Sequence, residues 1–268
     1  MSASSSARRT TQLLGRLRWV VGRLTPCGVH EIRRATRATR PYGPLPRHPF
    51  KVIDALRSSR LEIVPENVDL RSGLIVDVGA NVGDWTEAVL RIVHGATVVA
   101  VEPAPDPART LRSRFADVPN VSIIEAALTD HAGTAVLNLT SHSHNSSLKR
   151  PLDMDGSYGS GWSTTGQIEV RTETLDRVVD GRAVSLLKID VQGAEASVLA
   201  GGSDALSRAS AVLLEVTTRP HYEDDSTFAL LDELMRSHGY RLAGVSPPFL
   251  GVEGEALWFD VCYRNLRR

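Results

Sequence analysis

The chain has 268 residues, of which 42% are apolar and 23% charged, and its formal net charge is zero. This length suits one large α/β domain with additions and a substantial core. Its two cysteines are too few for a disulfide framework, no spacing typical of a metal site occurs, and no stretch approaches the roughly 18 apolar residues of a membrane span. We therefore expect a cytoplasmic protein in a reducing compartment.

The first 50 residues form a basic arm. Of the 31 basic and 31 acidic residues, ten arginines and one acid, Glu31, lie in residues 1–50, so the remainder has an excess of nine acids. Together with the proline-rich run 41–49, this shift in charge predicts a boundary near residue 50. We therefore divide the chain into an arm, residues 1–50, and a domain, residues 51–268.

Apolar residues of the arm repeat at helical spacing, with arginines on another face: Leu13, Leu14, Leu17, Val20, Val21 and Leu24. Such a basic amphipathic helix could lie on an anionic membrane surface and make the protein membrane-associated. We favour the alternative of a helix that packs on its own domain or on a second subunit of a homodimer. A transit peptide shares this composition, whereas arginines within the apolar run argue against a secretory signal.

The first predicted core strand, residues 74–78, runs into a glycine-rich turn and then a helix from Asp84, where Asp84 and Glu87 have capping-box spacing. Glycine lets the backbone turn tightly and approach a ligand, and the start of a helix offers unpaired N–H groups. The order of strand, turn and helix is therefore typical of a nucleotide-type cofactor site. The candidate cofactor-binding residues here are Asp77, Gly79, Asn81 and Gly83.

The spacing of this turn selects the type of cofactor. It is D-x-G-x-N-x-G, not the dinucleotide fingerprint G-x-G-x-x-G that faces a pyrophosphate, and Asp77 is placed to meet a cation. The second strand, 97–101, ends at Glu102, where a carboxylate can accept hydrogen bonds from both ribose hydroxyls. A site for one nucleoside without phosphate predicts S-adenosylmethionine. Asn81 either bonds the amino-acid part of this cofactor or only tolerates a left-handed turn.

Strands and helices alternate from residue 51 onward, beginning with a predicted short helix over 52–61. The third strand, 121–124, leads to Ala127 and Leu128, where adenine would stack. This βαβαβ order implies parallel strands with right-handed crossovers. Strands over 240–245 and 257–263 are expected to pair antiparallel at one edge. We predict a Rossmann-like, doubly wound, seven-stranded α/β sheet that is mostly parallel with an antiparallel edge strand, preceded by the basic helical arm.

A polar loop, residues 141–166, interrupts the alternation between predicted strands 134–139 and 167–172. A loop of this length is usually functional or disordered, and we favour a lid over the cofactor or a wall of the substrate site. Tyr158 and Trp162 in this loop could stack on a sugar ring.

Six segments together resemble the FkbM family of S-adenosylmethionine-dependent O-methyltransferases: DVGANVG (77–83), VEPAP (101–105), EAALTD (125–130), NSSL (145–148), TLD (174–176) and LKIDVQGAEASVLAG (187–201). The resemblance covers about residues 72–264 and leaves out the arm. It implies a class I methyltransferase fold and methylation of a hydroxyl on a carbohydrate, such as a sugar, oligosaccharide or glycolipid, or on a polyketide or lipid. Where the family often has glutamate this chain has Gln192, so no carboxylate is available there.

Asp190 and Glu215 follow adjacent predicted strands at the carboxyl ends, the edge where ligands bind in open α/β sheets. One of these carboxylates could take the proton of the acceptor hydroxyl, or both could hold Mg²⁺ that lowers the pKa of that hydroxyl. Alternatively, Asp190 caps the next helix and Glu215 pairs with an arginine. His221 and His144 are further candidate bases. Lys188, in a buried strand, needs a carboxylate or backbone partner.

Two other classes of function remain as alternatives. A nicotinamide oxidoreductase is disfavoured by the missing G-x-G-x-x-G and the lack of a phosphate cradle. A non-catalytic module could dock on membranes or nucleic acid through the arm, but we expect no nucleic acid among the partners.

Overall fold

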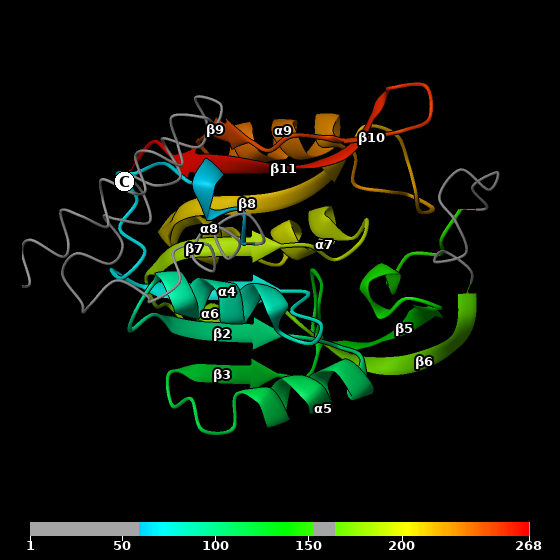
Figure 1. Cartoon of the computed structure of the whole chain (residues 1–268), viewed down its shortest axis with the longest axis horizontal. Coiled ribbons are helices and arrows are strands. Elements are labelled where there is room, and N and C mark those ends of the chain that lie inside the picture. The colour runs from blue at the N-terminus through cyan, green and yellow to red at the C-terminus, as the bar shows by residue number, and fades with distance from the viewer. Residues whose placement is uncertain (1–58, 153–163, 268) are drawn as a thin grey trace, which may run out of the picture.

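The computed structural model describes residues 59–152 and 164–267 (Figure 1). The predictions for the arm, for most of the helix over 52–61, and for Tyr158 and Trp162 lie outside these residues. Of that predicted helix, Ser59 is helical, Arg60 lies in a turn and Leu61 begins a 3-10 helix, η1 (Leu61–Ile63). No helix among the described residues is long and apolar enough to cross a bilayer.

The described chain alternates strands and helices through most of its length. In chain order after η1 the elements are β1 (Leu74–Val78), α4 (Asp84–Ile92), β2 (Thr97–Val101), α5 (Pro105–Arg114), β3 (Val121–Ile124), β4 (Ala127–Leu128), β5 (Gly133–Thr140), η2 (Ser143–Asn145), β6 (Thr164–Glu173), α6 (Leu175–Val179), β7 (Val184–Ile189), α7 (Glu195–Ala200), α8 (Ser203–Arg208), β8 (Ala209–Thr217), α9 (Phe228–Ser237), β9 (Tyr240–Val245), β10 (Phe249–Leu250) and β11 (Ala256–Asn265).

The main sheet has the predicted doubly wound, mostly parallel form. Strands β3, β2, β1, β7 and β8 are parallel neighbours in that order, and β11 pairs antiparallel with β8 (Figure 1). The predicted antiparallel pairing of the last two long strands, β9 and β11, is confirmed. Two details differ from the prediction: the two-residue β10 is an eighth strand, and the antiparallel strand β11 lies one position inside the edge because β9 and β10 both pair with it.

Side chains of the central strands alternate between two faces, each covered by helices. Ile75, Val98 and Leu186 pack with α4 and η1 on one face. Val76 and Leu187 pack with α6, α7, α8 and α9 on the other. Strands buried on both faces need nearly continuous apolar sequence, which explains why β1 and β7 are so apolar. The polar residues that do occur in them, Asp77 and Lys188, therefore require partners inside the fold.

The predicted strands around the polar loop exist but lie outside the main sheet. They form β5 and β6, which pair antiparallel, and β4 pairs parallel with β6 to complete a three-stranded sheet. Figure 1 shows β5 and β6 beyond the carboxyl ends of the parallel strands. This second sheet therefore stands beside the edge at which ligands bind in such folds.

The start of α4 differs from the predicted capping box. Its N-cap is Gly83 in the left-handed region, without a side-chain cap. Asp84 and Glu87 instead pair with Arg114 at the end of α5, with 2.6 Å between Arg114 Nη1 and Asp84 Oδ1. The glycine turn places Asp84 inside the helix, where its side chain cannot reach back to the first N–H groups.

Candidate active site

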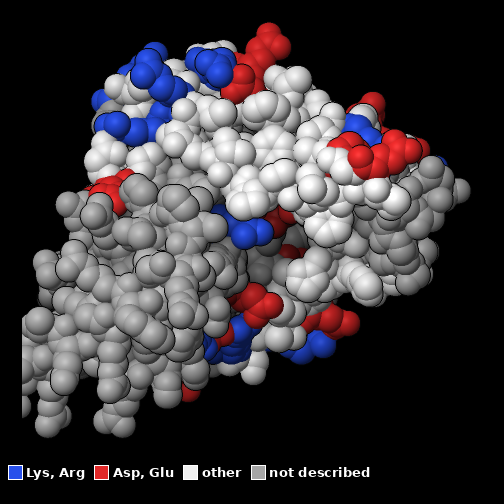
Figure 2. Space-filling model, turned by 45° about the horizontal axis from the view of Figure 1, so that its top comes forward, with Lys and Arg blue, Asp and Glu red and all other residues white. Residues whose placement is uncertain are grey.

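A cavity of about 290 Å³ opens at the carboxyl ends of β1, β2, β7 and β8. Figure 2 shows a hollow in the surface with acidic side chains inside it and a basic side chain at its edge. Nine of the predicted site residues line the cavity: Gly79, Asn81, Glu102, Ala127, Leu128, His144, Asp190, Glu215 and His221. Among the described residues that line it, none is lysine or arginine. The described part of the lining thus offers no lysine or arginine to a pyrophosphate.

Glu102 lies at the tip of β2 and is 6% exposed. Its Oε2 accepts a hydrogen bond from the Asn81 N–H and its Oε1 one from the Ala104 N–H, both at 2.8 Å. Burial raises the pKa of Glu102 above its ordinary value, although these two donors lower it. Each carboxylate oxygen can accept more than one bond, so a fixed acceptor remains on the cavity side. This is the arrangement expected of a ribose-binding carboxylate.

The glycine turn brings the β1 loop against the loop after β7. Gly79 has φ +79°, and a Cβ there would lie 1.9 Å from the Asp190 carbonyl oxygen. Asn81 takes the left-handed conformation (φ 48°), and its side chain accepts a hydrogen bond from the Val82 N–H at 2.8 Å. The turn therefore requires Gly79, and the left-handed conformation proposed as one role of Asn81 is present.

Gly83 does not line the cavity. A Cβ on this residue would lie 2.6 Å from both Leu111 and Phe115, so the glycine serves the packing of α4 against α5. A role in helix packing therefore fits Gly83 better than the predicted contact with the cofactor.

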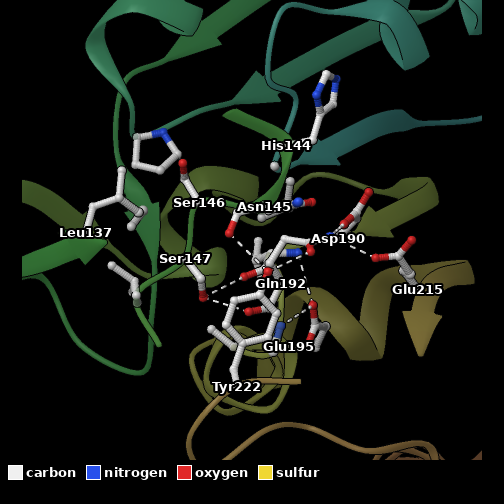
Figure 3. A pocket seen from close by; sticks show the side chains of 18 of the residues that line it. Leu137, His144, Asn145, Ser146, Ser147, Asp190, Gln192, Glu195, Glu215 and Tyr222 are labelled. Atoms are coloured by element: carbon white, nitrogen blue, oxygen red, sulfur yellow. Dashed lines mark hydrogen bonds between the residues drawn. The ribbon is translucent and has the colours of Figure 1, made fainter. Parts of the chain in front are cut away.

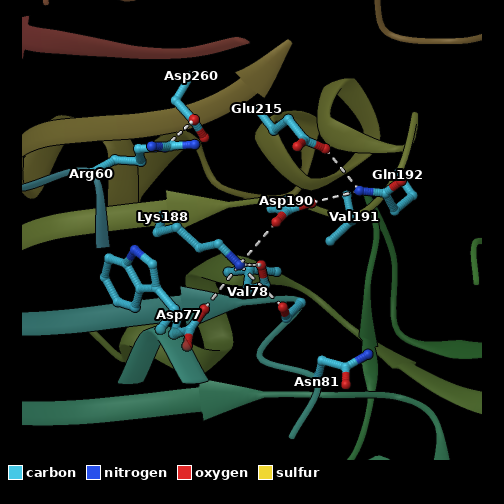
Figure 4. A network of polar contacts seen from close by, with 12 residues as sticks. Arg60, Asp77, Val78, Asn81, Lys188, Asp190, Val191, Gln192, Glu215 and Asp260 are labelled. Carbon is cyan, nitrogen blue, oxygen red and sulfur yellow. Dashed lines mark hydrogen bonds and ion pairs between the residues drawn. The ribbon is translucent and has the colours of Figure 1, made fainter. Parts of the chain in front are cut away.

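Asp77 meets a cation, as predicted, but the cation is Lys188 from the neighbouring strand. Lys188 Nζ lies 3.2 Å from Asp77 Oδ1 and 3.4 Å from Asp190 Oδ2, and it donates to the Gly79 carbonyl at 3.1 Å (Figure 4). Asp77 Oδ2 also accepts from Thr86 Oγ1 at 2.7 Å. Asp77 is fully buried and does not line the cavity, so it supports the turn from below.

Asp190 and Glu215 are brought together by Gln192. Gln192 Nε2 donates to Asp190 Oδ1 and to Glu215 Oε2, each at 2.8 Å (Figure 4). Burial, and then the charges of Asp190, Asp260 and Glu195, raise the pKa of Glu215 well above its ordinary value. Neither alternative role is seen among the described residues: the N-cap of α7 is Ala194, and Glu215 accepts a hydrogen bond from Gln192.

Glu195, at the start of α7, is a site residue that the sequence did not single out. It is 3% exposed, and its Oε1 accepts from the Val191 N–H at 3.0 Å and the Gly193 N–H at 3.3 Å. Burial raises its pKa to about 8. An acid in the first turn of a helix after a glycine was the available signal. Glu195 thus fixes the loop that carries Asp190 and Gln192.

Residues 143–148 of the polar loop form one wall of the cavity (Figure 3). Ser147 Oγ donates to the Gln192 carbonyl at 2.6 Å. The Tyr222 hydroxyl lies 3.0 Å from both the Asn145 carbonyl and Gln192 Oε1. The prediction of a substrate wall therefore fits this described part of the loop.

The two predicted histidines differ in their surroundings. His221 is 1% exposed, its backbone N–H donates to Asp225 Oδ2 at 2.7 Å, and its ring meets the Trp258 ring edge-on at 6.0 Å. Burial lowers the pKa of His221, which favours the neutral ring. His144 is exposed at the outer rim. Neither histidine is hydrogen-bonded to Asp190 or Glu215 in the described part of the chain.

The described residues do not fit the predicted Mg²⁺ site. No group of three or more His, Cys, Asp or Glu side chains within 59–152 and 164–267 is arranged to hold a metal ion. The Gln192 amide lies between the two predicted ligands, Asp190 and Glu215. By contrast, the Glu102 carboxylate, the close backbone at Gly79 and the apolar wall of Ala127 and Leu128 fit S-adenosylmethionine.

The sequence of the chain is similar to those of known methyltransferases. Residues 77–242 match the model of the methyltransferase FkbM domain. The chain is 32% identical over 217 residues to the 31-O-demethyl-FK506 methyltransferase FkbM of Streptomyces tacrolimicus, covering 69% of this chain and 80% of that protein. It is 26% identical over 195 residues to the 2-O-methyltransferase NoeI of Sinorhizobium fredii, covering 69% and 78%. Among solved structures, Aeropyrum pernix fibrillarin with bound S-adenosyl-L-methionine aligns with a TM-score of 0.45 at 11% identity, covering 77% of this chain and 73% of that one.

Proposed function

Since the chain belongs to the FkbM methyltransferase family and is an S-adenosylmethionine-dependent O-methyltransferase, we propose that its acceptor is a carbohydrate hydroxyl. The acceptor would be a sugar, an oligosaccharide or a glycolipid. The observation that carries this proposal is the array of Asp190, Gln192 and Glu215 in the cavity wall. Carboxylate and amide groups on the loop after β7 and on strand β8 suit an acceptor with several hydroxyl groups, each of which both donates and accepts hydrogen bonds.

The cofactor would be held by residues at the ends of β1 and β2 and by the short strand β4. Glu102 would accept from the ribose hydroxyls, Ala127 and Leu128 would contact the adenine, and the backbone from Gly79 to Asn81 would meet the amino-acid part. When bound, S-adenosylmethionine supplies an electrophilic methyl group. The protein's task is then to hold the acceptor oxygen in line and to take its proton.

Glu215 is the better placed of the two acids to take that proton. Both oxygens of Asp190 have partners, since Oδ1 accepts from Gln192 and Oδ2 faces the Lys188 ammonium. Glu215 is bonded by Gln192 through Oε2, which leaves Oε1 as the oxygen to receive the proton. Burial and the neighbouring acids raise the pKa of Glu215, which makes its carboxylate a stronger base. Asp190 would then orient the acceptor.

The test is a Glu215→Gln variant assayed with a panel of sugar acceptors. Because an amide cannot take the proton, we expect kcat to fall about 10²- to 10⁴-fold while the affinity for S-adenosylhomocysteine stays within about two-fold. Mass spectrometry of the methylated product and calorimetric titration measure the two quantities. Glu233→Gln, an exposed acid on α9, is the matched control. Undiminished turnover in the Glu215 variant would rule out its role as base.

A second acceptor class, a polyketide or lipid hydroxyl, is favoured by one apolar surface. Phe249 stacks on Trp258, with ring centroids 4.0 Å apart and an angle of 8° between the planes, and Trp258 lines the cavity. Phe249, Leu250 and Val252 are 53%, 54% and 90% exposed. An apolar acceptor would gain by covering this surface. Measuring kcat/KM for sugars and for apolar alcohols in wild type and in Phe249→Ser separates the two acceptor classes. The substitution should lower kcat/KM for apolar alcohols and leave kcat/KM for sugars unchanged.

A further inference from the structure

The side chain of Gln192 lies between two carboxylates in an orientation that its partners define. Its Nε2 is 2.8 Å from Asp190 Oδ1 and 2.8 Å from Glu215 Oε2. Its Oε1 accepts from the Tyr222 hydroxyl at 3.0 Å. Reversing the amide would turn its carbonyl oxygen toward both carboxylates, so only the present orientation satisfies all three contacts.

The backbone of Gln192 is also held in place. Its φ of 57° is in the left-handed region, which is uncommon for a residue other than glycine. Ser147 Oγ donates to its carbonyl at 2.6 Å, and Glu195 accepts the N–H groups on either side, from Val191 and Gly193. A conformation that costs energy persists only where its surroundings fix it. The amide is therefore built into the site.

Two carboxylates that face one point usually need a positive partner between them. A divalent cation could fill that place, since Mg²⁺ binds carboxylate oxygens at roughly 2.0–2.1 Å. Here the point is filled by an amide nitrogen, and its two hydrogens match the two oxygens. The remaining charge of Asp190 is balanced by Lys188 at 3.4 Å. A bridging cation could enter only if the amide left.

We propose that Gln192 takes the place of a bridging divalent cation, so that Asp190 and Glu215 work as a pair without metal. Gln192 is then a positioning residue that acts through the two acids. A second consequence follows: Gln192→Glu would put a third carboxylate at the same point and create a divalent-cation site. The inference rests on the proposed function for its activity measurements, whereas its metal titrations stand alone.

The metal titrations use Mg²⁺ and Mn²⁺ with the full chain in the presence of S-adenosylhomocysteine, followed by calorimetry. We expect no binding to wild type and binding to Gln192→Glu with a dissociation constant on the order of 10⁻⁴ M. The double variant Gln192→Glu/Glu215→Gln should lose that site, which distinguishes it from adventitious binding elsewhere. Binding by wild type that Glu215→Gln abolishes would overturn the proposal, as would a Gln192→Glu variant that keeps its S-adenosylhomocysteine affinity but binds no metal.

The activity measurements use wild type with excess EDTA and the Gln192→Ala variant. Turnover of wild type should be unchanged by EDTA, whereas loss with EDTA and recovery with Mg²⁺ would overturn the proposal.

In Gln192→Ala we expect kcat to fall about ten-fold or more. The Gln192 hydrogen bond lowers the pKa of Glu215 against the opposing effects of burial, Asp190, Asp260 and Glu195. Removing this hydrogen bond should therefore raise the pKa of Glu215 and shift the acid limb of the pH profile of kcat/KM to higher pH. An acid limb at the same pH as in wild type would contradict the positioning role of Gln192. If no acceptor is methylated, the proposed function fails while the metal titrations still decide the inference.

Discussion

Glu102 and Glu195 are buried carboxylates that differ in what surrounds them. Glu102 ends β2 and accepts from the N–H groups of Asn81 and Ala104 on the cavity wall. Glu195 accepts from Val191 and Gly193, and the acids Asp190 and Asp225 lie near it. The first residue should therefore govern cofactor affinity, and the second should govern how stability depends on pH.

Replacing Glu102 with alanine should weaken binding of S-adenosylmethionine and S-adenosylhomocysteine about 100-fold. Each hydrogen bond to a charged group contributes about 1.5–3 kcal/mol, and the variant would lose the ribose bonds as well as the anchor of the turn. Calorimetric titration measures the effect. Glu125→Ala is the control, because Glu125 pairs with Arg112 on the surface. Equal affinity in wild type and Glu102→Ala would remove Glu102 from the cofactor site.

Replacing Glu195 with glutamine should change how stability depends on pH. The folded protein keeps the Glu195 proton up to a pKa of about 8, whereas the unfolded chain loses it near the ordinary value of 4.5. Between these values the unfolded state binds fewer protons, so the Glu195 contribution to stability falls as pH rises. The glutamine does not titrate, so the variant should gain roughly 2 to 4 kcal/mol relative to wild type between pH 4.5 and pH 8.5.

Urea denaturation of both proteins at those two pH values measures this difference in the free energy of unfolding. Glu233→Gln, which changes an exposed acid, should show no such trend. A constant difference between wild type and Glu195→Gln across the range would mean that Glu195 is ionised in the folded protein.

At the scale of elements, the turn between β1 and α4 depends on its approach to the loop after β7. Gly79 and Gly95 have almost the same φ, +79° and +78°, but only Gly79 has an atom within 4 Å of a Cβ position. Comparing the stabilities of alanine variants at these two glycines therefore separates the cost of backbone strain from the cost of steric overlap.

Gly95→Ala should cost about 1–2 kcal/mol of stability, the strain of a left-handed alanine. Gly79→Ala should reduce stability clearly more than Gly95→Ala, and it should weaken S-adenosylhomocysteine binding at least ten-fold. The reason is that its Cβ would displace the Asp190 carbonyl and the loop that carries Asp190 and Gln192. Urea denaturation and calorimetry measure both. Equal losses in the two variants would show that the close approach does not matter.

At the scale of the whole molecule, the ion pairs of Lys188 join the two central strands beneath the site. Lys188 is 7% exposed and lies between Asp77 of β1 and Asp190 after β7. Burial alone would lower the pKa of Lys188, but the two carboxylates outweigh it and the pKa is raised. Lys188 therefore stays protonated, and its one positive charge serves both Asp77 inside the sheet and Asp190 at the cavity.

Lys188→Met should destabilise the protein by about 3–5 kcal/mol, since it leaves the buried Asp77 carboxylate without a positively charged partner. Adding Asp77→Asn should restore part of the loss because one uncompensated charge is removed. Urea denaturation gives both values. Arg208→Met, at an exposed pair with Asp204, should leave stability nearly unchanged. A Lys188 variant as stable as wild type would contradict the structural role of the Lys188 ion pairs.

Much of the fold and of the cofactor site followed from local sequence. The apolar run of β1, the glycine turn and the acid at the end of β2 each specify local geometry, and parallel strands bring their carboxyl ends to one edge. The doubly wound sheet, the place of Glu102 and the cavity position of Asp190 and Glu215 were therefore predictable. The predictions for residues 1–50, including membrane contact and a homodimer, stay predictions.

Only the tertiary structure decided how side chains from distant segments combine. In the structure Asp77 forms an ion pair with Lys188, and Gly83 allows α4 to pack against α5. The Gln192 amide lies between Asp190 and Glu215. The tertiary structure also placed β4, β5 and β6 in a separate sheet. These outcomes depend on contacts between residues far apart in the chain, because burial, charge compensation and strand pairing are set by neighbours in space. Sequence periodicity specifies a strand or a helix, but it carries no information about which partner a buried polar group will find.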